Sequence, residues 1–441
     1  MASGRGMAMN GHRFKPYPDY KDSGADWLGE IPAHWEARRL KYVAPPRAEK
    51  LSTKPDDTVY VGLENVESWT GRLLLENQPE TVDSAVATFY CGDILFGKLR
   101  PYLAKAARPG FDGVCTSEIL PLRPVEQNTQ SFVMYCLLNA PYIRWLDSLT
   151  YGTKMPRVSP EQVAGSFVPL PPEPEQRAIA AFLDRETARL DALVAKKERL
   201  IDLLQEKRAA LITRAVTKGL DPTVPMKDSG VEWLGEIPAH WDAKRLRHVG
   251  EPIIGLTYEP DDVVGPDEGT MVLRASNVKA GRIVCDDNVF VRTAIPEHLR
   301  TRLGDVLICA RSGSRDLIGK NATIDECAVG LTFGTFMIVF RSPCNPFLFC
   351  VFNSALFEYQ SGTFLTSTIN QLTVGNLKNM TVPVAPDREQ HAIAAFLDRE
   401  TAKLDALIAK VHDAIRRLTE LRTALISAAV TGKIDVREED G

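Results

Sequence analysis

Two stretches of the sequence combine basic and aromatic residues at a spacing that suits the binding of phosphate groups. The first lies between Gly92 and Gly110, where a single acid, Asp93, stands among several cations. The second reads YGTKMPRVS from Tyr151 to Ser159. Lysine and arginine contact nucleic-acid phosphates, and arginine also pairs with base edges. The candidate DNA-binding residues of these two stretches are Lys98, Arg100, Tyr102, Lys105, Lys154 and Arg157.

A later part of the chain offers a comparable set of side chains. It joins the cations of ARSGSRDLIGK to the amides of LTSTINQLT, and asparagine and glutamine read base edges in the major groove. A basic cluster by itself is more often a solvated face. Two clusters at corresponding places of a repeated chain favour DNA binding over that alternative. The candidate residues here are Arg311, Arg315, Lys320, Asn370 and Gln371.

The motifs of common catalytic sites are incomplete or missing. Gly92–Lys98 reads GDILFGK and fits the start of a P-loop, but Leu99 stands where that motif needs a Mg²⁺-binding Ser or Thr, so the start of a strand is the better interpretation. The sequence has no [DNS]PP[YFW] tetrapeptide of an adenine methyltransferase, no HExxH zinc motif and no CxxC pair. His34 and His240 are most simply structural. We therefore predict a chain that is not an enzyme and that holds no metal or cofactor itself.

Composition places the chain among ordinary globular proteins. Of its 441 residues, 44% are hydrophobic and 25% are charged, and the formal net charge is −4. No apolar run approaches the roughly 20 residues of a membrane span, and Met1–Lys15 lacks the apolar centre of a secretory signal. We expect a cytoplasmic protein with reduced cysteines, in which local rather than net charge governs nucleic-acid binding.

The chain repeats itself. Asp22–Val43 and Asp228–Val249 are identical at 16 of 22 positions, and Glu175–Leu193 and Glu389–Leu407 at 17 of 19. The stretches between them match only weakly, although GDILFGKLR from Gly92 aligns with GDVLICARS. Such an order, in which a scaffold is kept and the intervening surface changes, is typical of two recognition modules on one framework.

The second repeated segment of each copy predicts a long helix. Glu175–Thr217 contains no Gly or Pro, and leucines recur along it at heptad spacing, which calls for a partner helix. A second row is predicted through Ile179, Leu193 and Leu200, and through Ile393, Leu407, Ala414 and Leu421 in the other copy. A mere packing stalk is the alternative to a functional spacer. The predicted helix–helix and subunit interface comprises Leu183, Leu190, Leu204, Leu211, Leu397, Leu404, Leu418 and Leu425.

The variable stretches mix short β-rich runs with turns and short helices. Strands are predicted at Thr58–Leu63, Asp93–Phe96, Thr270–Leu273 and Phe333–Phe340, and helices at Gln130–Leu138 and Pro346–Phe357. The tryptophans of the first repeated segment are expected in the core. We predict an α+β fold: two pseudo-symmetric α/β recognition domains joined by two long helices that form an antiparallel coiled coil. The predicted parts are a first recognition domain (17–172), a first helix (173–218), a linker with the second recognition domain (219–386) and a second helix (387–435).

In combination, these motifs resemble the specificity (S) subunit of type I restriction–modification systems. The resemblance rests on WLGEIPxHW at Trp27–Trp35 and Trp233–Trp241, on GDILFGKLRPYLAK and YGTKMPRVS, and on PxxEQxxIAxFLD, which ends at Asp184 and at Asp398. It covers the chain from about Tyr17 to Asp435. The second domain departs from the pattern because ARSGSRDLIGK replaces KLRPYLAK, so its contact residues are transferred less directly.

The resemblance implies a division of labour among subunits. Each recognition domain is expected to read one half of a bipartite double-stranded DNA target, with the coiled coil as a ruler between the halves. The subunit itself is non-catalytic. It is expected to recruit two methylation subunits, which use S-adenosylmethionine, and, in the full complex, two ATP-driven restriction/translocase subunits. S-adenosylmethionine, ATP and Mg²⁺ are thus expected in the partner subunits, and no membrane is involved.

Two other functions stay open from the residues alone. An interaction scaffold or decoy would dock methylation subunits through its helices without reading DNA. A self-sufficient nuclease or methyltransferase would modify DNA without partners. Sequence-selective binding of duplex DNA separates the first alternative from a specificity subunit, and methyl transfer by the purified chain alone would revive the second.

Overall fold

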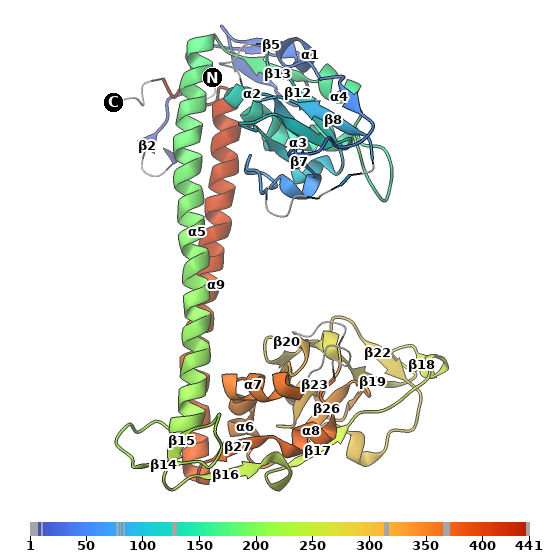
Figure 1. The fold of residues 1–441 in the computed structure, drawn as a ribbon, viewed down its shortest axis with the longest axis vertical. Helices are drawn as coiled ribbons and strands as arrows, with labels where there is room; N and C mark the ends of the chain where they lie inside the picture. The colour runs from blue at the N-terminus through green and yellow to red at the C-terminus, as the bar shows by residue number, and fades with distance from the viewer. Residues whose placement is uncertain are drawn as a thin grey trace. The chain divides into compact units, whose positions relative to one another are not determined.

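The computed structural model of the chain describes residues 8–9, 12–75, 79, 81–82, 84–125, 130–312, 317–364 and 371–437 (Figure 1). The chain divides into two compact units. Unit 1 comprises residues 1–197 and 413–441, and unit 2 comprises residues 198–412. Two long helices, α5 (Glu173–Lys218) and α9 (Asp387–Val430), each contribute one part to each unit.

Unit 1 carries the first variable region. Its shorter helices are α1 (Leu40–Val43), α2 (Gln130–Leu137), α3 (Ala140–Ser148) and α4 (Pro160–Gly165), with 3₁₀ turns η1 (Leu63–Asn65) and η2 (Pro101–Leu103). Its strands are β1 (Ala8–Met9), β2 (His12–Arg13), β3 (Tyr20–Asp22), β4 (Glu30–Pro32), β5 (Glu36–Arg39), β6 (Lys50–Leu51), β7 (Tyr60–Val61), β8 (Val86–Phe89), β9 (Ile94–Gly97), β10 (Ala106–Ala107), β11 (Gly113–Thr116), β12 (Ile119–Leu122) and β13 (Phe167–Leu170).

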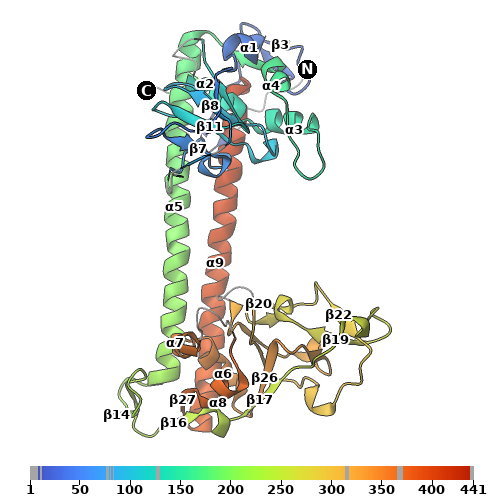
Figure 2. The ribbon, with the colours of Figure 1, turned by 45° about the vertical axis from the view of Figure 1, so that its right-hand side comes forward.

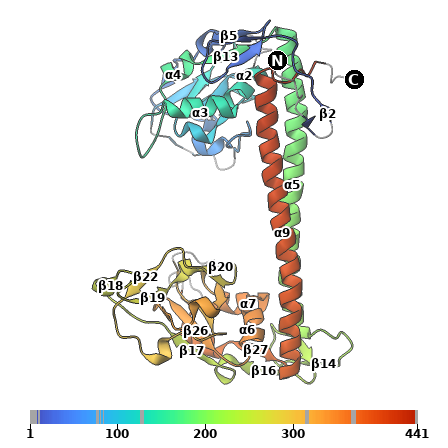
Figure 3. The same cartoon turned by 180° about the vertical axis from the view of Figure 1, so that it is seen from behind.

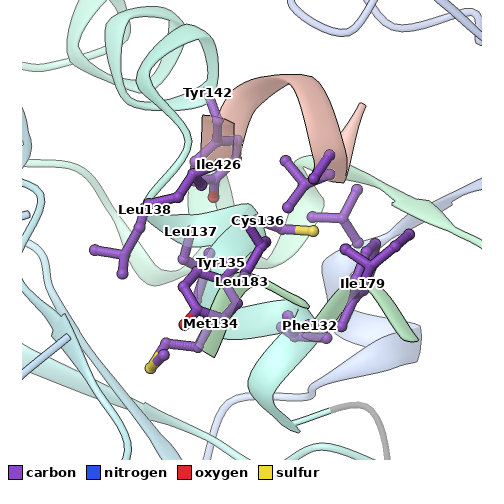
Figure 4. Packing of buried hydrophobic residues seen from close by; sticks show 14 of the residues in the cluster. Phe132, Met134, Tyr135, Cys136, Leu137, Leu138, Tyr142, Ile179, Leu183 and Ile426 are labelled. Carbon is purple, nitrogen blue, oxygen red and sulfur yellow. The ribbon is translucent and has the colours of Figure 1, made fainter. Parts of the chain in front are cut away.

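The sheets of unit 1 are small and mainly antiparallel. Strands β10-β9-β12 form one sheet and β6-β8-β11-β7 another, in which only the β11–β7 pair is parallel among these strands. Strand β5 pairs with β13, so the start of the variable region is joined to the segment that leads into α5. Helices α2 and α3 pack with α5 and the end of α9 in one core, where Leu183 and Ile426 meet Tyr135 and Tyr142 (Figures 3 and 4).

Unit 2 repeats this plan around the second variable region. Its shorter helices are α6 (Asn345–Phe352), α7 (Ala355–Phe364) and α8 (Val374–Asn379), with a 3₁₀ turn η6 (Ala275–Asn277). Its strands are β14 (Met226–Asp228), β15 (Glu236–Pro238), β16 (Asp242–Arg245), β17 (Glu251–Ile254), β18 (Val263–Val264), β19 (Thr270–Leu273), β20 (Val278–Lys279), β21 (Arg282–Ile283), β22 (Val289–Val291), β23 (Val306–Cys309), β24 (Asn321–Thr323), β25 (Thr332–Phe333), β26 (Met337–Arg341) and β27 (Thr381–Val384).

The sheets of unit 2 repeat those of unit 1 only in part, because the sheet around β23 has four strands where the sheet around β9 has three. Strands β17-β26-β23-β24 and β18-β22-β19-β25 form its two larger sheets, and β16 pairs with β27 as β5 does with β13. Helix α7 lies beside α5, where the backbone N–H of Ala355 donates to the hydroxyl of Thr213 at 3.1 Å (Figure 2). Ile212 and Val216 of α5 share a core with Trp241 and with α6 and α7.

The repeated segments meet each other at one junction in each unit. In unit 1 the indole N–H of Trp35 donates to Glu175 at 3.1 Å, and His34 Nε2 lies 2.9 Å from the same carboxylate. In unit 2 the indole of Trp241 donates to Glu389 at 2.9 Å, and His240 lies 2.6 Å from it. Both glutamates stand in the first turn of a long helix, where negative charge is favoured. Trp35 and Trp241 are fully buried, which confirms the prediction of core aromatics for these two residues, whereas Trp27 and Trp233 are partly buried.

The two long helices run antiparallel within each unit. In unit 1, Arg422 of α9 donates to Asp191 of α5 at 3.0 Å, while Gly432, just beyond α9, accepts from Tyr20 beside the start of α5. In unit 2, Arg208 of α5 donates to Asp405 of α9 at 3.0 Å. Leu183, Leu190, Leu204, Leu397, Leu404 and Leu425 are buried, and Leu211 and Leu418 are partly buried.

The second predicted leucine row is wrong over part of its length. Leu193, Leu200 and Leu407 are 38%, 40% and 43% exposed, whereas Ile201 and Ile212 are buried. The reason is the phase of the heptad: Leu193 and Leu200 lie one step away from the seam that continues through Ile201 and Leu204. Sequence spacing allowed both phases, and packing selects one of them.

Two predicted elements of the second variable region are each divided in the structure. The run Phe333–Phe340 turns at Gly334, so that it supplies the end of β25 and most of β26 in different sheets. The predicted helix Pro346–Phe357 breaks at Asn353 and Ser354, between α6 and α7. In both cases hydrophobic residues on each side hid the break, because a short apolar run does not reveal a turn.

Candidate nucleic-acid interface

The two predicted basic stretches of unit 1 lie side by side. Leu99 and Arg157 form a β-bridge, the N–H of Arg100 donates to Pro156 at 2.7 Å, and the N–H of Val158 donates to Lys98 at 3.1 Å. Backbone hydrogen bonds therefore join the loop after β9 to the segment before α4. We call residues 98–105 and 151–158 together the first reading surface, since they bring the predicted cations to one place.

The loop after β9, which supplies residues 98–105 of this surface, contains two residues with left-handed backbone. Arg100 has a φ of 52° and Ala104 a φ of 45°, and they flank the turn η2. Left-handed backbone is uncommon outside glycine and costs free energy, so it persists where surrounding contacts impose it, often at binding sites. The side chains of Arg100, Tyr102 and Lys154 are exposed on this loop pair.

The remaining cations of unit 1 differ in their surroundings. Lys98 is partly buried, and burial lowers the pKa of its ammonium group. Arg157 lies 3.7 Å from Glu118, so one acid already balances part of its charge. The ammonium of Lys105 donates to the carbonyl oxygens of Leu63 at 2.6 Å and Val66 at 2.9 Å. Lys105 thus holds η1 against the loop, and at most one of its three N–H donors is left for a phosphate.

Unit 2 has the same backbone arrangement with different side chains. Arg311 and Gln371 form the β-bridge, and the N–H of Leu372 donates to Ala310 at 2.7 Å. By the repeat, Arg311 is equivalent to Leu99 and Gln371 to Arg157. We call Arg311, Lys320 and Gln371 the second reading surface; Lys320 ends the loop between β23 and β24 and is partly buried. The predicted residues Arg315 and Asn370 lie outside the described residues.

A pocket of about 480 Å³ adjoins Arg311, and no sequence motif indicated it. The Arg311 guanidinium lies 5.1 Å from the centre of the Phe336 ring, which is 52% exposed. Tyr258 and Arg274 also line the pocket, and Arg274 pairs with Asp287 at 2.7 Å. The only signal for Phe336 was the Gly334-Thr335 pair before it, which marks a turn inside a run that otherwise reads as one strand.

The P-loop-like motif is the start of a strand. Strand β9 follows Asp93 directly, and Asp93 accepts from the N–H of Tyr90 at 2.8 Å and from Arg47 at 3.0 Å. In unit 2, Asp305 before β23 accepts from the N–H of Arg302 at 2.9 Å and from Arg341 at 2.6 Å. The carboxylate in each copy is therefore paired with an arginine of its own unit, so it does not reduce the positive charge of the reading surfaces.

Within the part of the chain that the structure describes, no group of three His, Cys, Asp or Glu side chains is placed to hold a metal ion. No described helix is both long enough and apolar enough to cross a membrane.

Comparison with known proteins places the chain in a family. Residues 88–202 and 304–417 match the model of the type I restriction modification DNA specificity domain. The two segments together cover more than half of the sequence and recur in both units, so the chain belongs to this family.

Individual relatives are distant. The type I restriction enzyme EcoDI specificity subunit of Escherichia coli is 26% identical over 49% of this chain, a match that spans 45% of that subunit's length. The putative type I restriction enzyme MjaX specificity subunit of Methanocaldococcus jannaschii is 22% identical over 93% of this chain and 96% of its own. A solved chain from work on complex assembly and conformational transition of the type I R-M system has a TM-score of 0.68, with 21% identity, over 92% of this chain and 99% of that one. That likeness shows a shared fold.

Proposed function

We propose that this chain is the DNA sequence-specificity subunit of a type I restriction–modification complex and that it reads a bipartite target, one half with each unit. The observation that carries the proposal is the pair of reading surfaces. Equivalent bridges, Leu99–Arg157 and Arg311–Gln371, hold equivalent loops, while the side chains on those loops differ. Two different half-sites require the same backbone framework in both units, with different side chains on its loops.

The chemistry of each surface suits duplex DNA. Arg100 and Lys154 are exposed cations beside Tyr102 in unit 1, and Arg311 beside Gln371 supplies a guanidinium and an amide in unit 2. Cations that reach phosphates fix the position of the protein, and arginine and glutamine distinguish bases. The long helices then act as the spacer between the half-sites.

The test is a salt series of DNA-binding measurements. Each of Lys98→Ala, Arg100→Ala and Arg311→Ala is expected to lower the slope of log K against log salt concentration by roughly 0.9 if the residue contacts one phosphate. Glu326→Ala, on an exposed acid of unit 2, is the matched control and leaves the slope unchanged. Unchanged slopes for all three cationic variants would overturn the assignment, and absence of any sequence-selective binding would favour the scaffold or decoy.

We also propose that the long helices recruit two methylation subunits, and restriction/translocase subunits in the full complex. Leu193 and Leu407 are equivalent in the repeat and are similarly exposed, at 38% and 43%. Exposed leucines at equivalent places, one in each unit, offer two like sites for two copies of one partner. S-adenosylmethionine, ATP and Mg²⁺ then belong to those partners, and the chain works in the cytoplasm without catalysing a reaction itself.

Partner binding is tested by changing both leucines. Leu193→Ser with Leu407→Ser is expected to weaken binding of the methylation subunit by about tenfold, because apolar area is lost from both sites. Lys196→Ser with Lys410→Ser is the control, since these exposed residues are also equivalent in the repeat. Equal binding by the two double variants would place the partner elsewhere on the chain.

A further inference from the structure

Arg422 joins three separate segments of unit 1. It lies on α9, is 7% exposed, and donates from Nε to Asp191 of α5 at 3.0 Å. Its other two nitrogens donate to backbone carbonyl oxygens of the variable region, Nη1 to Trp69 at 2.7 Å and Nη2 to Thr70 at 3.0 Å. A planar guanidinium with fixed donor directions holds three acceptors in one geometry, which a flexible ammonium does not.

The turn that Arg422 holds has a strained backbone. Residues 67–72 form a tight turn closed by the Glu67–Arg72 backbone hydrogen bond of 3.0 Å, and Trp69 has a φ of 67°. A bulky residue with left-handed backbone is an outlier that surrounding contacts must impose. The guanidinium of Arg422 is one of the contacts that hold this turn, because it binds the carbonyl oxygens of Trp69 and Thr70.

The same turn is tied to the first reading surface. The N–H of Trp69 donates to the carbonyl of Ala104 at 3.1 Å. The ammonium of Lys105 donates to Leu63 and Val66, which precede the turn. A short series of hydrogen bonds therefore runs from the helix pair through Arg422 and the turn to residues 104 and 105 of the reading surface.

The equivalent arginine of unit 2 lacks this link. Arg208 occupies the same position of the repeat as Arg422, and Asp405 the same position as Asp191. Arg208 donates to Asp405 at 3.0 Å, its side chain is 37% exposed, and within the described residues it makes no hydrogen bond to the variable region. The turn equivalent to 67–72 is the shorter connection between β20 and β21, where a side chain in place of Gly281 would meet the Phe349 ring.

We propose that Arg422 is a positioning residue that fixes the orientation of the first reading surface on the helix pair, and thereby the length of the gap that the target may have between its half-sites. This inference rests on the proposed function. The positioning role belongs to unit 1. Unit 2 repeats the ion pair between the two long helices but not the hydrogen bonds from the arginine to the variable region.

The primary experiment measures gap selectivity. The purified complex is offered duplexes that carry both half-sites, found by selection from randomised DNA, with gaps of the native length and of one base pair more or less. For Arg422→Gln we expect the preference for the native gap to fall roughly tenfold, the scale of one mismatched base pair, while binding of an isolated first half-site is kept. Arg208→Gln is the matched control and keeps the wild-type preference.

A second measurement does not depend on DNA. Spin labels on non-natural residues at Ser84 and Thr419, both exposed and both in unit 1, report the distance between the variable region and α9. Arg422→Gln is expected to broaden this distance distribution. Arg422→Lys is expected to broaden it as well, although this variant keeps the positive charge. Arg422→Lys also serves if the glutamine variant does not fold.

The outcomes separate the two ideas. A wild-type chain without sequence-selective binding contradicts the proposed function. A selective wild-type chain whose Arg422 variants keep both the gap preference and a narrow distance distribution contradicts the positioning role. Equal loss of gap preference in Arg208→Gln contradicts it as well, because the ion pair alone would then be responsible.

Discussion

The two junctions and the two reading surfaces of this chain diverged to different extents. At the junctions, the same tryptophan, histidine and glutamate recur, and Trp35–Glu175 and Trp241–Glu389 make the same hydrogen bond. At the reading surfaces, only the backbone pairing recurs, and Leu99 in one copy stands where Arg311 stands in the other. The side chains are thus kept at the junctions and changed at the two surfaces, a difference that fits the proposed function.

The junctions also differ from each other in burial. Glu175 is 5% exposed and receives a further hydrogen bond from Tyr17, a residue near the N-terminus, whereas the side chain of Glu389 is 42% exposed. The unit 1 junction is completed by the C-terminal segment, where Lys15 pairs with Asp435 and Arg437 lies over the Tyr17 ring. The same motif is thus buried more deeply where residues 15–17 and 435–437 lie against it.

The largest expected effect follows from that difference in burial. Glu175→Ala leaves Trp35 and Tyr17 without their acceptor in a buried site, and we expect it to lower the free energy of unfolding of unit 1 by about 3 kcal/mol. Glu389→Ala acts at a site open to water, and about 1 kcal/mol is expected for unit 2. Denaturant unfolding followed by tryptophan fluorescence measures both. Equal losses would show that exposure does not distinguish the two junctions.

An intermediate effect is expected at the pocket of unit 2. Phe336→Ala removes the ring beside the Arg311 guanidinium, a contact worth about 0.5–1 kcal/mol at exposed sites. The affinity for the second half-site is expected to fall a few-fold, and the affinity for the first half-site to stay as it is. Phe336→Leu keeps the bulk without the aromatic ring and serves as the control. If leucine restored full affinity, the ring would act only by filling space.

The smallest effect is a difference in pH dependence between the two surfaces. Burial lowers the pKa of Lys98, so its charge is lost at a lower pH than that of an ordinary lysine as the pH rises. A DNA phosphate favours the charged form, so binding by unit 1 should take up a proton in the alkaline range and weaken there. Arginine guanidinium groups do not titrate in this range. Binding of each half-site measured at increasing alkaline pH tests this. Parallel curves for the wild-type chain, or a difference between the curves that persists in Lys98→Arg, would contradict it.

Repetition in the sequence predicted the framework well, and sequence patterns predicted the loops poorly. Helical periodicity and the absence of Gly and Pro defined α5 and α9, and the order of motifs around Trp35 and Glu175 indicated which segments belong together. The phase of the leucine rows was wrong at Leu193 and Leu200, because a heptad read from one chain admits two seams. The break at Gly334 was missed because apolar residues surround it.

The candidate site was predicted by residue type and completed by backbone pairing. Basic composition indicated Lys98, Arg100 and Arg311, but no local pattern shows that Leu99 pairs with Arg157 or that Lys105 turns toward Val66. Those contacts join residues far apart in the chain. Arg422 and Phe336 were missed for the same reason: on a helix and in a strand-like run they look like ordinary surface and core residues.

The central claim is that each unit reads its own half of a split DNA target. The direct measurement is selection of bound duplexes from a randomised library by the complex containing the wild-type chain, the Lys98→Ala/Arg100→Ala variant or the Arg311→Ala variant. We predict two conserved blocks separated by a fixed gap for the wild type, with the first variant relaxing one block and the second variant relaxing the other. A single continuous block, or relaxation of both blocks by either variant, would contradict the account.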